Sequence, residues 1–267
     1  MTACNILTAV LGLLFGSFVN VLIHRLPHMI LSADQNTSPS LRYDLCWPAS
    51  HCPHCDSTLK AWHNIPVVSY LWLKGRCGFC QQRISWRYPL IEITTALIWL
   101  MCIGWKGCHA AGFAWAVCFT LLLAASAIDW QTQLLPDVLT QALVWLGLLS
   151  ASFGWTQLEV TQAVWGAATG YVSLWSVATA FRRITGKHGM GAGDFKLLAG
   201  LGAWLGPLAL LPVVILASVS GAMVGLWLQS NQRLTEEGHM PFGPFLAIGG
   251  VAVAVIGIEP IAMWMSW

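Results

Sequence analysis

Long uninterrupted runs of apolar residues constrain this chain more than any other feature of its sequence. A hydrocarbon core about 30 Å thick is crossed by about 20 apolar helical residues. Stretches of this kind lie at residues 5–24, 90–106, 109–128, 137–154, 159–180, 197–212, 213–229 and 243–265. Because a segment in a bilayer must satisfy its own backbone polar groups, we predict an all-α polytopic membrane protein with about eight transmembrane helices. The sixth and seventh stretches abut at Pro212, where proline allows a tight turn or a kink.

The composition excludes a water-soluble monomer. Of the 267 residues, 57% are hydrophobic and 9% are charged, against about 25% charged in a typical soluble domain. The net charge of +2 indicates neither acidic partners nor nucleic acid. The first apolar stretch has no basic region before it and no small-residue cleavage site, so we expect a retained helix rather than a removable signal peptide.

The few basic residues predict the orientation, because positively charged loops remain in the cytoplasm during membrane insertion. Segment 25–88 holds seven of them and is expected to be a cytoplasmic insertion between the first and second helices. Eight crossings from an external N-terminus place twelve of the thirteen basic residues inside and only Lys106 outside. We therefore divide the chain into a first transmembrane helix (1–24), a cytoplasmic zinc-binding loop domain (25–88) and a seven-helix transmembrane core (89–267).

The zinc site is predicted from two cysteine pairs in that insertion, Cys52-Pro53-His54-Cys55 and Cys77-Gly78-Phe79-Cys80. Each pair puts two sulfurs on one tight turn, and the two turns together can supply the four thiolates of a tetrahedral zinc site. Disulfides are the alternative, but a cytoplasmic loop lies in a reducing compartment. We therefore predict a closed structural site whose metal stabilises the loop domain, with these ligands: Cys52, Cys55, Cys77 and Cys80.

The other cysteines and nearby histidines fit this pattern less well. Three side chains could substitute as ligands but break the paired spacing: Cys46, His51 and His54. The remaining cysteines lie in or beside apolar stretches, where a thiol usually serves as a small buried side chain: Cys4, Cys102, Cys108 and Cys118. We assign them no chemistry.

Three aspartates lie at the predicted cytoplasmic ends of apolar stretches, where an ionisable group is costly and usually functional. Asp129 ends the third stretch, Asp137 begins the fourth, and Asp194 precedes the sixth. Helix capping explains Asp137 as well as chemistry does, whereas Asp129 faces the unfavourable negative end of a helix dipole. We therefore predict that Asp129 and Asp194 form a catalytic pair, in which one carboxylate activates water and the other, protonated, acts as an acid.

Glycines precede Asp194 in the segment Gly189-Met190-Gly191-Ala192-Gly193. Glycine lets a backbone approach another chain closely, so we expect an extended peptide to be positioned here. The candidates for positioning a substrate are Gly191, Gly193, Asp137 and Lys196. Two further carboxylates within apolar stretches, Glu92 and Glu259, are assigned to no chemistry.

Six motifs in order resemble those of a known family, the type IV prepilin peptidases, also called leader peptidase/N-methyltransferases, of type IV pilus and type II secretion systems. The resemblance covers nearly the whole chain and is specific because the motifs occur together. They are Gly16–Val21 with Arg25 and Pro27, the paired cysteines, Arg87–Glu92, Ile128-Asp129 with Leu135–Asp137, Gly191–Asp194, and Pro241–Phe245.

The resemblance implies an aspartyl protease of the GxGD kind, with Asp129 and Asp194 as its catalytic pair and the four paired cysteines as zinc ligands. Such enzymes remove a short positively charged leader from prepilins and pseudopilins at the cytoplasmic face of the bacterial inner membrane. Many of them then methylate the new N-terminus with S-adenosylmethionine. No Gly-rich cofactor loop is recognisable here, so the residues that bind this methyl donor are not assigned. The implied partners are these substrates and the lipid bilayer, without nucleic acid.

Two other functions compete with the peptidase. A proton- or cation-coupled transporter would use the intramembrane aspartates, but it would need carboxylates near the midplane and paired broken helices. A non-catalytic assembly component could dock a cytoplasmic partner on the zinc knuckles, but it leaves the glycine-flanked Asp194 unexplained. The sequence indicates neither which prepilins are substrates nor the oligomeric state.

Overall fold

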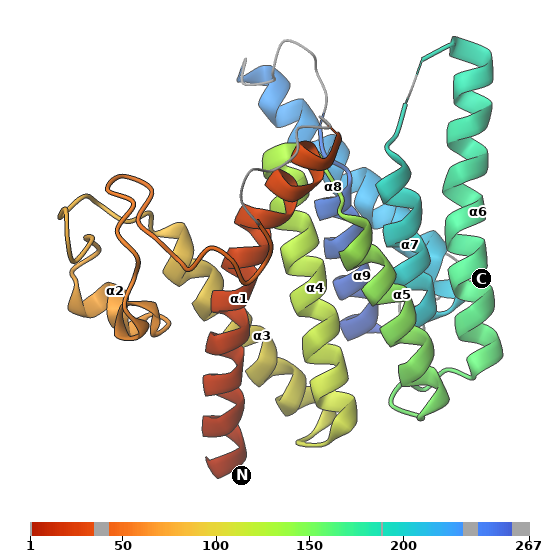
Figure 1. Cartoon of the computed structure of the whole chain (residues 1–267). Helices are drawn as coiled ribbons and strands as arrows, with labels where there is room; N and C mark the ends of the chain where they lie inside the picture. Colours follow the sequence, from red (N-terminus) through yellow and green to blue (C-terminus); the bar gives the residue numbers. More distant parts are fainter. Residues whose placement is uncertain (1, 35–42, 188, 232–239, 258–267) are drawn as a thin grey trace. The chain divides into compact units, whose positions relative to one another are not determined.

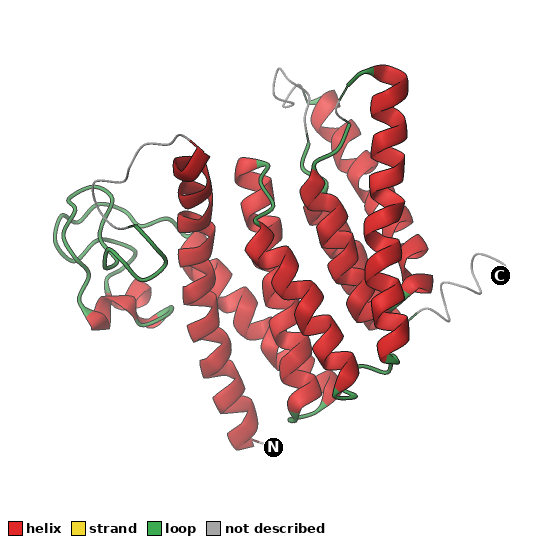
Figure 2. Ribbon diagram, turned by 45° about the vertical axis from the view of Figure 1, so that its right-hand side comes forward, coloured by secondary structure: helices red, strands yellow, loops and turns green. Residues whose placement is uncertain are grey.

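The computed structural model describes residues 2–34, 43–187, 189–231 and 240–257. Over these residues the chain consists of helices and loops (Figure 1, Figure 2), and no strand is described. Two compact units divide the chain, residues 1–120 and 121–267, and their border lies inside the fourth helix. The predicted all-α fold is confirmed.

Each of the eight predicted apolar stretches coincides with a helix in the described part of the chain. In chain order these helices are α1 (Thr2–Asp34), α3 (Arg87–Lys106), α4 (Ala110–Thr132), α5 (Asp137–Ser152), α6 (Val160–Thr185), α7 (Ala192–Leu205), α8 (Leu210–Ser230) and α9 (Gly243–Ile256). Four segments are long and apolar enough to cross a membrane: Thr2–Ser32, Arg87–Lys106, Ala110–Thr132 and Pro207–Ser230. Helices α5 and α9 are apolar but shorter. The protein is a multi-pass membrane protein.

Helix α1 is longer than predicted, since it continues past residue 24 to Asp34. Pro27 lies inside the helix and is buried. Arg25, only 7% exposed, donates from its guanidinium to the backbone oxygens of Asp44 at 2.8 Å and Pro48 at 2.6 Å. These bonds attach the following loop to the helix. Helix α1 therefore has polar partners beyond residue 24, where its apolar stretch ends, and it continues past that residue.

The turn between the sixth and seventh stretches is also displaced from its predicted position at Pro212. Helix α7 ends at Leu205, and the chain turns at Gly206, whose φ of 80° favours glycine. A short 3-10 helix, η2 (Pro207–Ala209), leads directly into α8. Pro212 lies in the first turn of α8, where its missing N–H is not needed for a helical hydrogen bond. The predicted end of the eighth stretch, with Glu259, lies outside the described residues.

The first unit is built on the close packing of α1 against α3. A Cβ added at Gly12 would lie 2.6 Å from the Cα of Ala96, so only glycine permits this approach. A disulfide joins Cys4, near the start of α1, to Cys108 in the turn between α3 and α4. The expectation that these two are unpaired buried thiols is therefore wrong, whereas Cys102 and Cys118 are buried thiols as predicted: each is at most 2% exposed.

Between α1 and α3 lies a loop region, residues 43–86, which contains the short helices η1 (Ala61–Asn64) and α2 (Val68–Trp72). Two isolated β-bridges occur in it, one around each cysteine pair. With so little regular structure, this region depends on its cysteine cluster for much of its cohesion.

Helix α7 is the centre of the second unit, where it packs against α5, α6 and α9 (Figure 1). Glycines allow the tightest of these contacts, which is between Gly166 on α6 and Gly202 on α7. A Cβ on either glycine would collide with the backbone oxygen of the other. All but one of the residues from Asp194 to Trp204 are buried. The first turn of α7 is thus held firmly by its neighbours.

Candidate functional site

Asp129 lies in the last turn of α4 and is 4% exposed. The backbone N–H of Gly243, the first residue of α9, donates to its Oδ2 at 3.0 Å. A helix N-terminus carries partial positive charge and stabilises an anion. Helix α9 therefore offsets the unfavourable position of Asp129 at the C-terminal end of its own helix.

Asp194 is the third residue of α7 and is 7% exposed. Its carboxylate receives a hydrogen bond from the backbone of Gly191, the N-cap residue, and it interacts electrostatically with Asp129. The bond to Gly191 is a capping contact, but it does not account for the second carboxylate beside it. The structure places together, within the second unit, the two aspartates that were predicted as a pair.

Leu135 packs against Gly193, which precedes Asp194 on α7, and against Gly243, whose N–H donates to Asp129. A Cβ at Gly193 would lie 2.5 Å from Leu135 Cβ, and a Cβ at Gly243 would lie 3.2 Å from Leu135 Cδ1 and 2.6 Å from Asp129 Oδ2. Both glycines are needed for this close approach. Leu135 and Gly243 were not predicted as site residues, and the only signal for them was their place in the motifs Leu135–Asp137 and Pro241–Phe245.

The four substrate-positioning candidates differ in their surroundings. Gly193 gives room to Leu135 and is half-buried. Gly191 is exposed, and a Cβ there would contact only Asp194 Oδ2, at 3.8 Å. The backbone at Gly191 is therefore the more accessible of the two to another chain.

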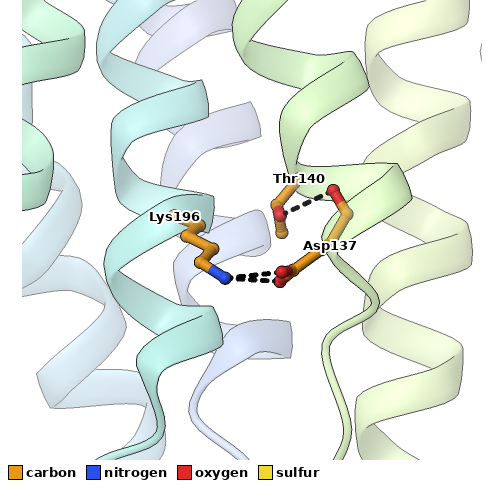
Figure 3. A network of polar contacts seen from close by, with 3 residues as sticks. All are labelled: Asp137, Thr140 and Lys196. Atoms are coloured by element: carbon orange, nitrogen blue, oxygen red, sulfur yellow. Dashed lines mark hydrogen bonds and ion pairs between the residues drawn. The ribbon is translucent and has the colours of Figure 1, made fainter. Parts of the chain in front are cut away.

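Asp137 and Lys196, the other two candidates, are paired with each other (Figure 3). Lys196 Nζ, on α7, donates to both carboxylate oxygens of Asp137 on α5, at 2.6 and 2.7 Å. Thr140 Oγ1 donates to the backbone oxygen of Asp137 at 3.2 Å. Asp137 is the first residue of α5, whose N-cap is Pro136 without a side-chain cap, so its carboxylate binds Lys196 rather than capping the helix. This pair ties the start of α5 to the first turn of α7, two residues from Asp194.

The second candidate site is the cysteine cluster of the first unit. The sulfur atoms of the four paired cysteines all lie within 4.8 Å of one another, and Cys52 Sγ is 3.8 Å from Cys80 Sγ. Tetrahedral zinc with Zn–S bonds of about 2.3 Å holds its sulfurs about 3.8 Å apart. None of the four forms a disulfide. The donor set and its spacing fit the predicted structural zinc, and Cys46, His51 and His54 are not part of this group of described residues.

Both cysteine pairs are built on the same local turn. The first cysteine of each pair accepts a hydrogen bond from the backbone N–H four residues later: Cys52 from Asp56 at 2.9 Å, and Cys77 from Gln81 at 3.1 Å. Asp56 and Gln81 both have positive φ, 52° and 60°, and reverse the chain after the second cysteine. Each turn therefore presents its two sulfurs on one side.

Hydrogen bonds favour the thiolate form at two of the four sulfurs. The side chain of Ser57, whose hydroxyl lies 3.4 Å from Cys55 Sγ, lowers the pKa of Cys55 to about 6. The backbone N–H groups of Cys80 and Phe79 lower the pKa of Cys77. Since the thiolate is the metal ligand, these bonds prepare Cys55 and Cys77 for a cation, whereas desolvation and the three neighbouring cysteines raise the pKa of Cys80 to about 11.

Two known protein families match this chain, one in each part. Residues 10–106 match the Bacterial Peptidase A24 N-terminal domain, and residues 116–226 match the Type IV leader peptidase family. The first match contains the cysteine cluster, and the second contains Asp129 and Asp194.

Several proteins named prepilin leader peptidase/N-methyltransferase are similar to this chain over nearly its whole length. That of Pseudomonas putida is 46% identical over 97% of this chain and 93% of its own. That of Dickeya chrysanthemi is 43% identical over 93% of this chain and 91% of its own. This chain belongs to the type IV leader peptidase family. No solved structure matches it.

Membership of this family confirms the resemblance inferred from the motifs and makes the chain an enzyme of the peptidase class. The transporter alternative is not supported, because similar proteins over the full length bear an enzyme name.

Proposed function

We propose that the protein is an aspartic endopeptidase of the bacterial inner membrane that removes the N-terminal leader from prepilins or pseudopilins of type IV pilus or type II secretion systems. It then methylates the new N-terminus with S-adenosylmethionine. The observation that carries the peptidase is the pair of buried aspartates at the end of α4 and the start of α7, which interact within the part of the chain that matches the leader peptidase family.

Asp129 and Asp194 hold the attacking water between them. Two interacting buried carboxylates favour a state in which one is ionised and the other protonated. The ionised carboxylate takes a proton as the water oxygen attacks the carbonyl carbon of the scissile bond, and the protonated carboxyl donates to the carbonyl oxygen. Collapse of this tetrahedral intermediate breaks the C–N bond as the amine receives a proton, so no acyl-enzyme forms.

The substrate reaches this site from the membrane. Its own apolar helix lies in the bilayer and delivers the scissile bond to the cytoplasmic boundary, where the basic loops of the chain lie. The exposed backbone at Gly191 admits the extended segment around that bond. The ion pair of Asp137 and Lys196 fixes the first turns of α5 and α7 and thereby the position of Asp194.

The metal serves the other unit, where the four paired cysteines lie. Four thiolates leave zinc no open position for water, so when bound it supplies a structural cross-link to the loop region. The cysteine cluster therefore acts in folding rather than in hydrolysis.

Mass spectrometry of a prepilin co-expressed with this protein tests the proposal, because one spectrum reports both leader loss and an added methyl group. The wild-type protein is expected to yield the shortened, methylated form, and Asp194→Asn the full-length form. Glu159→Gln, an exposed carboxylate at the start of α6, is the matched control and should cleave as the wild type does. A full-length prepilin in the presence of folded wild-type protein would contradict the proposal.

A further inference from the structure

Helix α2, in the loop region of the first unit, carries an exposed apolar face. Val68, Leu71 and Trp72 lie on one side of the helix, because they are spaced three and four residues apart. They are 52%, 70% and 77% exposed. Ser69 and Tyr70, on the other side, line a cavity of the first unit together with residues of α1 and α3. The apolar side of α2 therefore points away from the unit, which is the reverse of a helix on a soluble domain.

The backbone just before α2 is attached to a residue inside the spanning helix α3. The N–H of Val67 donates to Oε2 of Glu92, which is buried, at 2.8 Å. A Cβ at Gly16 of α1 would lie 2.6 Å from the Cα of Glu92, so α1 and α3 touch at these two residues. Gly16 lies eight residues before the end of the apolar stretch 5–24, which is about 12 Å along a helix. Helix α2 thus begins at the depth of the apolar parts of α1 and α3.

The arrangement of the first unit agrees with this depth. Both views show α2 at the height of the middle of α1 rather than beyond its end (Figure 1, Figure 2). The loop region therefore returns along α1 after leaving it. Because α1 and α3 are long and apolar enough to cross a membrane at this height, a face that points away from them meets lipid.

The contact with Glu92 meets a requirement of backbone at this depth. Val67 precedes the helix and has a φ of 59°, so its N–H has no helical acceptor. A backbone donor without an acceptor is costly in an apolar environment. The carboxylate of Glu92 provides that acceptor, which accounts for a buried acidic side chain in a spanning helix.

The charges around α2 complement an anionic lipid surface. Residues 57–91 contain five basic side chains and no acidic one. All five are exposed: Lys60, Lys74, Arg76, Arg83 and Arg87. Lys60 Nζ lies 5.3 Å from the centre of the Trp62 ring, and Trp62 is exposed as well. Tryptophan and basic side chains together are typical of the membrane interface, where basic groups attract anionic headgroups.

We propose that α2 docks on the bilayer, with Val68, Leu71 and Trp72 among the acyl chains and the surrounding basic side chains at anionic headgroups. This surface continues the lipid-facing sides of α1 and α3, because α2 is attached beside them through Glu92. A soluble partner would have to reach α2 at a depth that lipid occupies. The docking holds the loop region and its cysteine cluster against the membrane, and it does not depend on either activity proposed above.

Photo-crosslinking tests this, with p-benzoylphenylalanine in place of Trp72 or, in a second variant, of Leu71. The matched control carries the same group in place of Trp47, another exposed tryptophan of the loop region. Its neighbour Pro48 accepts a hydrogen bond from Arg25, which is nine residues beyond Gly16 on α1, or about 14 Å along a helix. Trp47 therefore lies nearer to water than α2 does. Zinc content and size-exclusion chromatography establish that each variant is folded, and Leu71 carries the test if the Trp72 variant is not.

The full-length, zinc-loaded protein is irradiated in nanodiscs of equal parts phosphatidylcholine and phosphatidylglycerol, together with a prepilin, and the adducts are identified by mass spectrometry. At position 72 or 71 we expect a phospholipid adduct that is lost at position 47. Phosphatidylglycerol should be enriched in it on the order of fivefold, the preference that one basic side chain near the surface provides. A folded variant without this adduct overturns the proposal, as does an equal yield at position 47, no preference between the lipids, or a conjugate with the prepilin or a second copy of the chain in place of lipid.

Discussion

Replacing Gly243 by alanine tests whether the backbone of α9 positions the Asp129 carboxylate. The new Cβ would lie 2.6 Å from Asp129 Oδ2, so the carboxylate must move by at least 0.4 Å to reach the 3.0 Å below which Cβ contacts are essentially never found. That movement weakens the hydrogen bond from the Gly243 N–H, now 3.0 Å long. A hydrogen bond to a charged group contributes about 1.5–3 kcal/mol, and a displacement of about 1 Å at a reacting group can lower a rate about a hundredfold.

We therefore expect Gly243→Ala to lower kcat for leader removal about tenfold to hundredfold, with little change in KM because the altered contact is to the Asp129 carboxylate and not to the exposed backbone at Gly191. Steady-state cleavage of a purified prepilin measures both constants. Gly221→Ala on α8 is the matched control, since its Cβ would lie at an ordinary 3.5 Å from Phe245 Cδ2. Equal kcat values for the two variants, each shown to be folded by size-exclusion chromatography, would refute the positioning role of α9.

Three further predictions follow from other contacts. Because the side chains of Lys196 and Asp137 are 31% and 57% exposed, a double-mutant cycle with alanine should give a coupling of at most about 1 kcal/mol in the free energy of unfolding, and a coupling several times larger would contradict this. Cys77→Ser should lower the zinc content, measured by mass spectrometry of the metal, from about one ion per chain to a small fraction; a full complement of zinc would exclude the four-cysteine site. Cys4 and Cys108 should react with a maleimide only after reduction, so a label found by peptide mapping on either of these two residues in the unreduced, folded protein would rule out their disulfide.

The helices and the cysteine cluster were predictable because their signals are local. An apolar run of bilayer length must be helical whatever lies around it, and two CxxC turns carry their sulfurs on one side by their own geometry. Helix ends were less predictable, since they depend on distant partners. Arg25 binds the carbonyl groups of residues 44 and 48, which no pattern near α1 indicates.

The proximity of Asp129 and Asp194 was predicted from the sequence, but the groups that position them were not. Asp129 and Asp194 were predicted as a pair because a carboxylate at a membrane boundary is energetically costly and is usually functional. The donor to Asp129 is Gly243, 114 residues away, and a backbone N–H carries no sequence signature. Leu135 was not predictable either, because an apolar residue in a largely apolar chain gives no sign that it packs closely against two glycines. Glu92 was left without a role, and its burial and its hydrogen bond from the backbone N–H of Val67 became visible only in the structure.

The central claim is that Asp129 and Asp194 act as one unit, and single-turnover cleavage of a prepilin by purified variants tests it most directly. Each of Asp129→Asn and Asp194→Asn should lower the rate by at least about a thousandfold, and the double variant should be no slower than the singles, because groups that act together are lost together. Single variants with rates near that of the wild type, or a double variant whose loss is the product of the two single losses, would contradict the account.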